Sequence, residues 1–216
     1  MSLSAFTILL GGELEPTERV RAAVAETRVI AADGGIRHAG SLGLVPELWV
    51  GDFDSSSEDL QAAFPDVPRM PYPAAKGETD GEIAIGAAIA RGARRLILAG
   101  ALGGERSDHA LQHLAYAVKL AEDGYEVLVT TGQEEAVPLV EGAIELDLPP
   151  TSLFSVVAFG ALEKLSIDNA RYPLAMFNLP FGSSRTISNV AEGKVRLTLK
   201  HGRAIVIARP YDLSGV

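Results

Sequence analysis

The chain of 216 residues is long enough for one large domain or two small ones, and its 47% hydrophobic and 22% charged residues are typical of soluble globular proteins. A net charge of −9 argues against a general surface for nucleic acids or anionic membranes, because the field of the whole protein would repel both. Zero cysteines exclude disulfides and thiolate metal sites, fit a reducing compartment and predict a cytoplasmic location.

The first residues resemble neither a signal peptide nor a membrane anchor. Met1 to Phe6 contain no basic region, and the apolar run from Phe6 to Leu10 is too short for a signal core. No apolar run reaches the roughly 18 residues of a membrane span. We therefore expect neither segment.

Strands and helices alternate over the first 131 residues, and most of the strands end in glycine or aspartate. This order is typical of an open parallel sheet in an α/β domain. We expect strands at 6–10, 28–32, 48–50, 94–99 and 125–131, and helices at 17–26, 36–42, 81–91 and 107–122, with a further helix start at 54–58.

In such folds ligands bind beyond the carboxyl ends of the strands. That rule places three turns on one rim: Gly11-Gly12, Asp33-Gly34-Gly35 and Asp52-Phe53-Asp54. Sharp strand-to-helix turns also use glycine for purely structural reasons, and that interpretation stays open for both glycine pairs. Neither pair forms a dinucleotide-binding GxGxxG or a Walker loop.

Asp52 and Asp54 are two residues apart at the end of an apolar strand. In extended backbone their carboxylates point to the same side, where a shared cation would relieve their repulsion. The alternative is that both are ordinary turn and cap residues, since the segment from Asp54 to Glu58 also has the pattern of a helix start.

Two later segments add polar groups. Thr79-Asp80 precedes a helix and either caps it or contributes a third carboxylate. Arg106 and Asp108 follow a glycine-rich turn, where they form either a phosphate site or an ion pair at a helix start. His109 and His113 are spaced to share a metal, but hard oxygen ligands fit this chain better than a zinc site.

After about residue 132 short strands are separated by turns, with no helical pattern between them. This predicts an all-β, sandwich-like domain, with a boundary between Thr131 and Glu135 and domains at 1–132 and 133–216. We expect strands at 136–140, 143–148, 153–158, 195–200 and 204–208, and hairpin turns at Glu141-Gly142 and His201-Gly202.

The segment from Asp168 to Asn189 lacks a strand pattern. It is rich in hydroxyls and amides with aromatic residues between them, as a polar heterocycle requires for stacking and edge hydrogen bonds. A mobile surface loop would have a similar composition, so both interpretations remain.

Together these motifs resemble the thiamine pyrophosphokinase family, whose members transfer a diphosphoryl group from ATP to the hydroxyethyl arm of thiamine and release AMP. Each motif is weak alone, but their order over nearly the whole chain is specific. The motifs are Ala32-Asp33-Gly34-Gly35, Gly51-Asp52-Phe53-Asp54-Ser55, Thr79-Asp80, Gly103-Gly104 with Arg106 and Asp108-His109, Tyr172-Pro173-Leu174, and Phe181 to Asn189.

The resemblance implies an ATP-binding α/β catalytic domain, a thiamine-binding β-sandwich and a homodimer with active sites where one subunit's α/β domain meets the other's C-terminal domain. It implies four groups of site residues. Mg²⁺ would be held by Asp52, Asp54 and Asp80; the phosphate and reaction site would include Arg106 and Asp108; the nucleotide site would include Asp33, Gly34, Gly35, Gly103 and Gly104; and thiamine would meet Tyr172, Thr186, Ser188 and Asn189.

Three positions depart from the family pattern. Gly77 stands where another acid is common, Glu105 is an apparent insertion in the phosphate loop, and His113 replaces a common asparagine. Two alternatives therefore stay open: a diphosphokinase acting on another hydroxymethyl heterocycle such as a pterin, and a thiamine- or nucleotide-binding regulator that has lost turnover.

Overall fold

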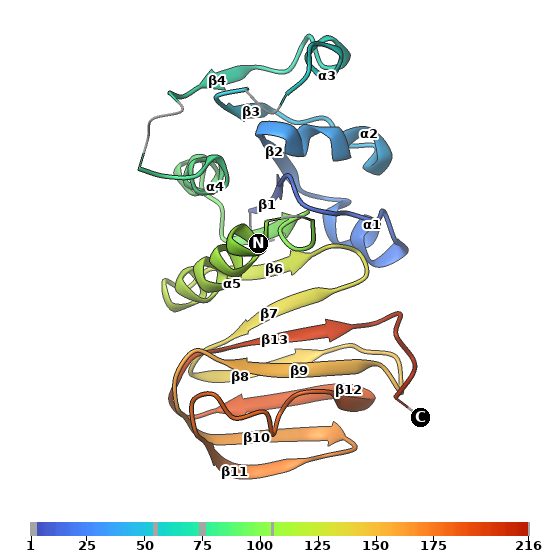
Figure 1. The fold of residues 1–216 in the computed structure, drawn as a ribbon, viewed down its shortest axis with the longest axis vertical. Helices are drawn as coiled ribbons and strands as arrows, with labels where there is room; N and C mark the ends of the chain where they lie inside the picture. Colours follow the sequence, from blue (N-terminus) through green and yellow to red (C-terminus); the bar gives the residue numbers. More distant parts are fainter. Residues whose placement is uncertain (1–3, 54–55, 74–76, 105, 216) are drawn as a thin grey trace. The chain divides into compact units, whose positions relative to one another are not determined.

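The computed structural model describes residues 4–53, 56–73, 77–104 and 106–215 (Figure 1). The predictions for Asp54 and Glu105 lie outside these residues. By internal contacts the chain divides into two compact units, Met1–His113 with Tyr125–Gly132, and Leu114–Gly124 with Gln133–Val216. The division into functional domains at residue 132 stays a prediction.

The N-terminal unit is a parallel sheet with helices between its strands, as the sequence predicts. Its strand order is β4-β3-β2-β1-β5-β6, and every neighbouring pair is parallel. The elements are β1 (Ala5–Leu9), α1 (Glu18–Val24), β2 (Arg28–Ala32), the 3-10 helix η1 (Asp33–Arg37), α2 (His38–Leu42), β3 (Leu48–Gly51), α3 (Glu58–Ala63), β4 (Arg69–Pro71), α4 (Asp80–Ala90), β5 (Arg95–Ala99), α5 (Ser107–Glu122) and β6 (Glu126–Thr130). Only the first part of α5, up to His113, belongs to this unit.

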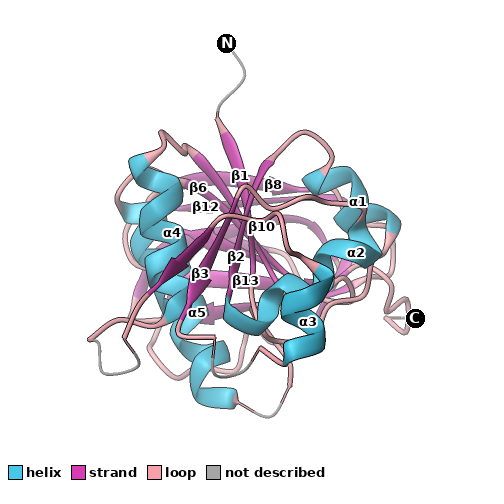
Figure 2. Ribbon diagram, turned by 90° about the horizontal axis from the view of Figure 1, so that it is seen from above, coloured by secondary structure: helices cyan, strands magenta, loops and turns pink. Residues whose placement is uncertain are grey.

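Both faces of this sheet are covered, with α4 on one side and α1 and α2 on the other (Figures 1 and 2). Alternate strand residues supply the two cores. Leu9 and Ile97 pack with Val20 of α1, whereas Ile8 and Leu98 lie on the opposite face of their strands. Because both faces are buried, the strands have continuous apolar sequences instead of alternating ones.

Two local features of this unit differ from expectation. The helix predicted at 36–42 begins as the 3-10 helix η1, which starts already at Asp33, and becomes α-helical only from His38, and β4 was not predicted. β4 has three residues with no buried side chain, so hydrophobicity gives no signal for it.

The C-terminal unit contains antiparallel strands around one apolar core. One group is β7 (Glu135–Leu139), β13 (Ala204–Arg209) and β9 (Leu153–Ala158); the other is β8 (Gly142–Leu146), β12 (Asn189–Leu199), β10 (Leu162–Ala170) and β11 (Leu174–Leu179). β12 belongs to both groups, because its first residues pair with β9 and its later ones with β8 and β10. Residues from both groups share the core, including Phe154, Val206, Leu165 and Leu197.

Two predictions for this half are wrong. The segment from Asp168 to Asn189 contains the end of β10 and all of β11, so only its later part is a loop. The strands were missed because register shifts interrupt their pairing, and Lys164, Asn169 and Met176 have positive φ. Such bulges break the two-residue period on which strand recognition depends.

The expected hairpins are also absent from the described pairing. β7 pairs with β13, and β8 pairs with β12, so Glu141-Gly142 carries the chain from one group of strands to the other. His201-Gly202 likewise joins the end of β12, paired with β8 and β10, to β13, paired with β7 and β9. Both turns are therefore corners between the two strand groups.

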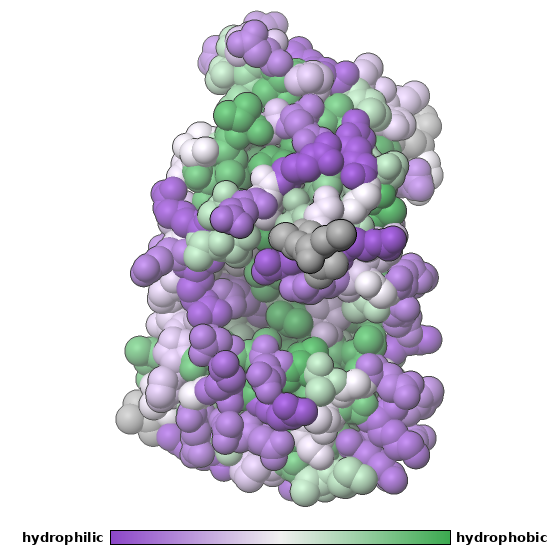
Figure 3. Space-filling view, turned by 180° about the vertical axis from the view of Figure 1, so that it is seen from behind, coloured by the Kyte–Doolittle hydropathy of each residue, from purple (hydrophilic) through white to green (hydrophobic). Residues whose placement is uncertain are grey.

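Polar residues cover much of the surface of both units in Figure 3, with smaller apolar patches between them. Within the described part of the chain, every helix is too short or too polar to cross a lipid bilayer.

Candidate active site

A cavity of about 480 Å³ opens at the carboxyl ends of the parallel strands. It lies where the strand order changes direction, with β2 on one side of β1 and β5 on the other. This crevice is the usual ligand site of an open α/β sheet. The lining residues come from the turns after β1, β2, β3 and β5 and from the first turns of α4 and α5.

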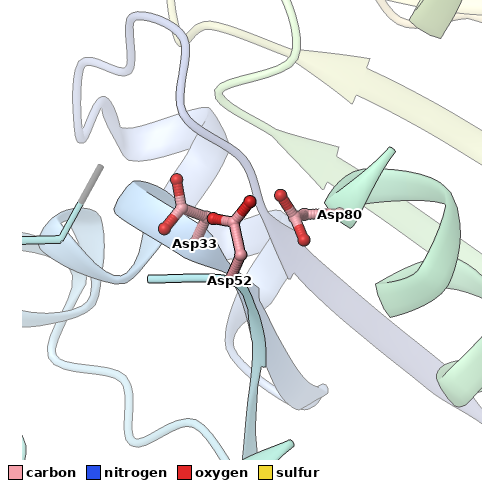
Figure 4. A group of neighbouring side chains, drawn as sticks. All are labelled: Asp33, Asp52 and Asp80. Carbon is pink, nitrogen blue, oxygen red and sulfur yellow. The ribbon is translucent and has the colours of Figure 1, made fainter. Parts of the chain in front are cut away.

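Asp33, Asp52 and Asp80 form a cluster of carboxylates in this cavity (Figure 4). One oxygen of each lies within 4.8 Å of the others, and all three side chains are half-buried. Asp33 follows β2, Asp52 follows β3, and Asp80 begins α4. Three carboxylate oxygens converging in a half-buried site are a donor set that fits a hard divalent cation such as Mg²⁺.

Thr79 caps α4. The sequence left open whether Thr79-Asp80 caps this helix or contributes a carboxylate, and the two residues divide these roles. The Thr79 hydroxyl accepts from the Glu82 amide at 3.2 Å, and the Glu82 carboxylate accepts from the Thr79 amide at 3.1 Å. This reciprocal capping box fixes the first turn of the helix. Asp80, one residue further on, lines the cavity.

Close backbone contacts form the floor of the cavity. A Cβ at Gly12 would lie 2.6 Å from the carbonyl oxygens of Gly100 and Leu102, and a Cβ at Gly35 would lie 2.2 Å from the Leu9 carbonyl oxygen. No side chain fits at these distances. Glycine at both positions lets the turns after β1, β2 and β5 pack directly against one another.

Arg37 and His38 tie these turns together. The Arg37 guanidinium donates to the carbonyl oxygens of Gly34, at 3.1 Å, Gly12, at 3.0 Å, and Gly11. His38 Nε2 lies 3.0 Å from the same Gly12 carbonyl. Burial lowers the pKa of His38, so the neutral ring donates through Nε2 and stabilises the turn.

Arg106 and Asp108 form an exposed bidentate pair at the start of α5. Nε and Nη2 of Arg106 donate to the two carboxylate oxygens of Asp108 at 2.9 and 2.8 Å. The hydrogen bonds from Arg106 hold the pKa of Asp108 well below its usual range. A carboxylate that resists protonation is a weak general base. Arg106 lines the cavity.

His109 and His113 also line the cavity. The sequence singled out His113 as a departure from the family pattern and as one of two histidines spaced to share a metal. His113 Nδ1 lies 2.8 Å from the Ala101 carbonyl oxygen, and the side chain is 9% exposed. Burial lowers the pKa of His113, so the ring is neutral at pH 7 and donates through Nδ1. Its Nε2 is then a hydrogen-bond acceptor.

The predicted thiamine residues lie together in the C-terminal unit. Asn189 is 4% exposed, and its amide bonds the backbone of Tyr172 twice, at 3.1 and 2.9 Å. The Thr186 hydroxyl is buried and donates to the Val156 carbonyl at 2.7 Å, so it fastens the loop to β9. Tyr172, 60% exposed, and Ser188 present their side chains at the surface.

The family model described as "Thiamin pyrophosphokinase, catalytic domain" matches residues 21–129, just over half of the chain. The match contains Asp33, Asp52 and Asp80 and the first turns of α5. The chain belongs to the thiamin pyrophosphokinase family. A comparison with curated protein sequences finds no significant match.

Solved pyrophosphokinase structures share the fold of the whole chain. Thiamine pyrophosphokinase from Bacillus subtilis superposes with a TM-score of 0.84 at 21% identity, covering 96% of this chain and 99% of that one. The enzyme from Geobacillus thermodenitrificans gives 0.82 at 23% identity, covering 96% and 98%. The one from Candida albicans gives 0.77 at 13% identity, covering 95% and 90%.

The predicted site residues of this pyrophosphokinase family member are distributed as follows. Asp33, Asp52, Asp80, Arg106 and the glycines at 34, 103 and 104 line one cavity, whereas Gly35 packs beneath it. Asp108 is not among the lining residues, and Asp54 lies outside the described residues. Asp33 was expected in the nucleotide site but lies with the metal candidates, because β2 and β3 are adjacent strands.

Arg37, His38 and His113 were not predicted as site residues. The sequence did contain a signal for Arg37 and His38. Both lie two to three residues after the Asp33-Gly34-Gly35 turn that was placed on the rim, and the backbone carbonyls of such packed turns need donors.

Proposed function

We propose that this protein is a Mg²⁺-dependent thiamine diphosphokinase, which transfers a diphosphoryl group from ATP to thiamine and releases AMP. The observation that carries the proposal is the carboxylate cluster of Asp33, Asp52 and Asp80 in the cavity at the strand ends. Family membership supports the choice of reaction.

The proposed reaction needs positioning and charge neutralisation more than covalent help from the protein. The thiamine hydroxyl oxygen bonds to the β-phosphorus of ATP and releases its proton to solvent, the bond from that phosphorus to the oxygen bridging the α-phosphate breaks, and AMP leaves. Bound Mg²⁺ would neutralise phosphate charge and polarise the phosphoryl oxygens. Asp33, Asp52 and Asp80 would hold it, with Asp54 as a further predicted ligand.

Arg106 is the proposed cation for the transferred group. Two of its three nitrogens bond to Asp108, which leaves Nη1 to meet a phosphate oxygen. Asp108 is then better suited to orient Arg106 than to remove the hydroxyl proton, because its lowered pKa makes it a weak base. Within the phosphate and reaction site that the family resemblance implies, we therefore assign Asp108 to Arg106 and not to the thiamine hydroxyl.

For the C-terminal unit we propose that Tyr172 stacks on thiamine and that Ser188 contacts its polar edge. Asn189 and Thr186 hold this loop through buried hydrogen bonds. We also propose a homodimer with shared active sites. Exposed apolar side chains at Tyr172, Met176, Phe181 and Ile187 support an interface on this unit. A cytoplasmic location, expected from the cysteine-free sequence, stays a prediction.

The decisive experiment is incubation of the purified protein with Mg²⁺, ATP and thiamine, followed by chromatographic measurement of AMP and thiamine diphosphate. We expect both products in equal amounts, and neither in excess EDTA. AMP formed only with a pterin alcohol would instead identify a different diphosphokinase. Thiamine or nucleotide binding without AMP would identify a binding protein.

A further inference from the structure

Asp33 has an unusual backbone conformation in the carboxylate cluster. Its φ is +39°, in the region that residues with a side chain rarely adopt, and such a conformation persists only where neighbouring groups impose it. Two neighbours hold this residue, one through its backbone and one through its side chain. Trp49 Nε1 donates to the Asp33 carbonyl oxygen at 2.8 Å, and the Ser56 hydroxyl donates to Asp33 Oδ1 at 3.1 Å.

Ser56 is itself held in place. It is 6% exposed, its amide donates to the Phe53 carbonyl at 3.2 Å, and its carbonyl accepts from Gln61 Nε2 at 2.9 Å. Arg69 of β4 donates in turn to Gln61 Oε1 at 3.1 Å. The hydroxyl that meets Asp33 is therefore positioned by α3 and β4, two elements that contribute no residue to the cavity lining.

We propose that Ser56 is a positioning residue for the metal site: its buried hydroxyl fixes the orientation of the Asp33 carboxylate, so that one oxygen meets those of Asp52 and Asp80. A hydroxyl donor fixes the plane of the carboxylate, as the outer partners of metal ligands commonly do. This inference rests on the proposed metal site but concerns a residue that touches neither metal nor substrate.

The test is Mn²⁺ binding to the full chain by calorimetry, in the absence of thiamine, with and without ATP. We expect Ser56→Ala to weaken Mn²⁺ binding about 10- to 100-fold, the usual effect of losing an outer hydrogen bond to a ligand. Ser56→Thr keeps the hydroxyl and should bind within about twofold of the unmodified protein. Ser41→Ala is the matched control, because its hydroxyl donates to the His38 carbonyl, away from the cluster.

Gln61→Ala provides a second variant if Ser56→Ala does not fold. It removes the donor that holds the Ser56 carbonyl and should weaken Mn²⁺ binding in the same direction by a smaller factor. Undiminished Mn²⁺ binding in Ser56→Ala, or equal losses of Mn²⁺ affinity in Ser56→Ala and Ser41→Ala, would overturn the proposed role of Ser56 but not the metal site. Absence of Mn²⁺ binding by the unmodified protein under both conditions would overturn the metal site itself.

Discussion

Two arginines of the cavity, Arg37 and Arg106, form hydrogen bonds with different kinds of partner, although each lies shortly after a pair of glycines. Arg106 bonds an exposed carboxylate and keeps one guanidinium nitrogen for a ligand, whereas Arg37 directs its donors to three backbone carbonyls. An arginine beside a phosphate site is usually interpreted as a phosphate ligand. Here the hydrogen bonds give Arg37 a structural function, whereas the pair with Asp108 occupies only Nε and Nη2 of Arg106, which is compatible with its proposed role at a phosphate.

Replacement of Arg37 should therefore lower the stability of the turns and also weaken substrate binding. We expect Arg37→Ala to lower the free energy of unfolding by about 2 kcal/mol, the scale for hydrogen bonds made by a charged donor, and to weaken ATP binding. Arg21→Ala is the matched control, because Arg21 also donates to backbone carbonyls, those of Pro16 and Ser41, but lies outside the cavity lining. Urea unfolding and ATP titration separate the two effects; unchanged stability in Arg37→Ala would contradict this function.

The two buried histidines predict a pH dependence of stability. Burial lowers the pKa of His38 and of His113 in the folded protein, so below about pH 6.5 the unfolded chain binds more protons than the folded one. Their contribution to stability is present above that pH and is lost as the pH falls towards the folded-state pKa. Urea midpoints measured between neutral and mildly acidic pH should decrease on acidification.

The variants His38→Asn and His113→Asn test whether the two histidines cause this decrease in urea midpoint on acidification. Each removes one group that must gain a proton on unfolding, so each should flatten the decrease in urea midpoint below about pH 6.5. Slopes identical to that of the unmodified protein in both variants would assign the pH dependence to other groups.

At the scale of elements, α4 brings its first residues to the cavity in a defined orientation. Replacement of the cap by Thr79→Ala should lower the free energy of unfolding by about 1 kcal/mol and reduce the apparent affinity for Mn²⁺, because the first turn carries Asp80. Thr79→Ser keeps the capping oxygen and should restore both values. Thermal unfolding and Mn²⁺ titration provide the measurements; a stability loss with unchanged Mn²⁺ affinity would show that Asp80 does not depend on the cap.

The secondary-structure elements differ in how well the sequence predicted them. The parallel strands other than β4 were predictable, because apolar runs such as residues 29–32 are buried and end in glycine- or aspartate-containing turns. The rim position of Asp33 and Asp52 followed from that pattern, whereas Asp80 was expected in the metal site from the family resemblance. β11 was not predictable, because half of its residues are exposed, only Leu179 is buried, and its pairing with β10 is irregular. Asp33 is bonded by Trp49 and Ser56. Tertiary packing brings these partners to it, and no local sequence pattern indicates them.

At the scale of the whole molecule, the proposed shared active sites can be tested by complementation. Asp80→Asn should inactivate the metal site, and Ser188→Ala combined with Tyr172→Ala should impair the thiamine site. If each active site uses both subunits of a two-fold dimer, mixing and reassembling the two inactive proteins should restore up to about a quarter of full activity. No recovery, with heterodimers verified by mass spectrometry, would place each site within one subunit.

The three carboxylates of the cavity come from three separate segments, the ends of β2 and β3 and the start of α4. A cation held by all three would be a reversible cross-link between distant parts of the chain. Such a link restricts the conformations open to the rim and adds binding free energy to the folded state in proportion to the logarithm of ligand concentration. The cation supply of the cell would then regulate how long the protein survives proteolysis as well as how fast it works.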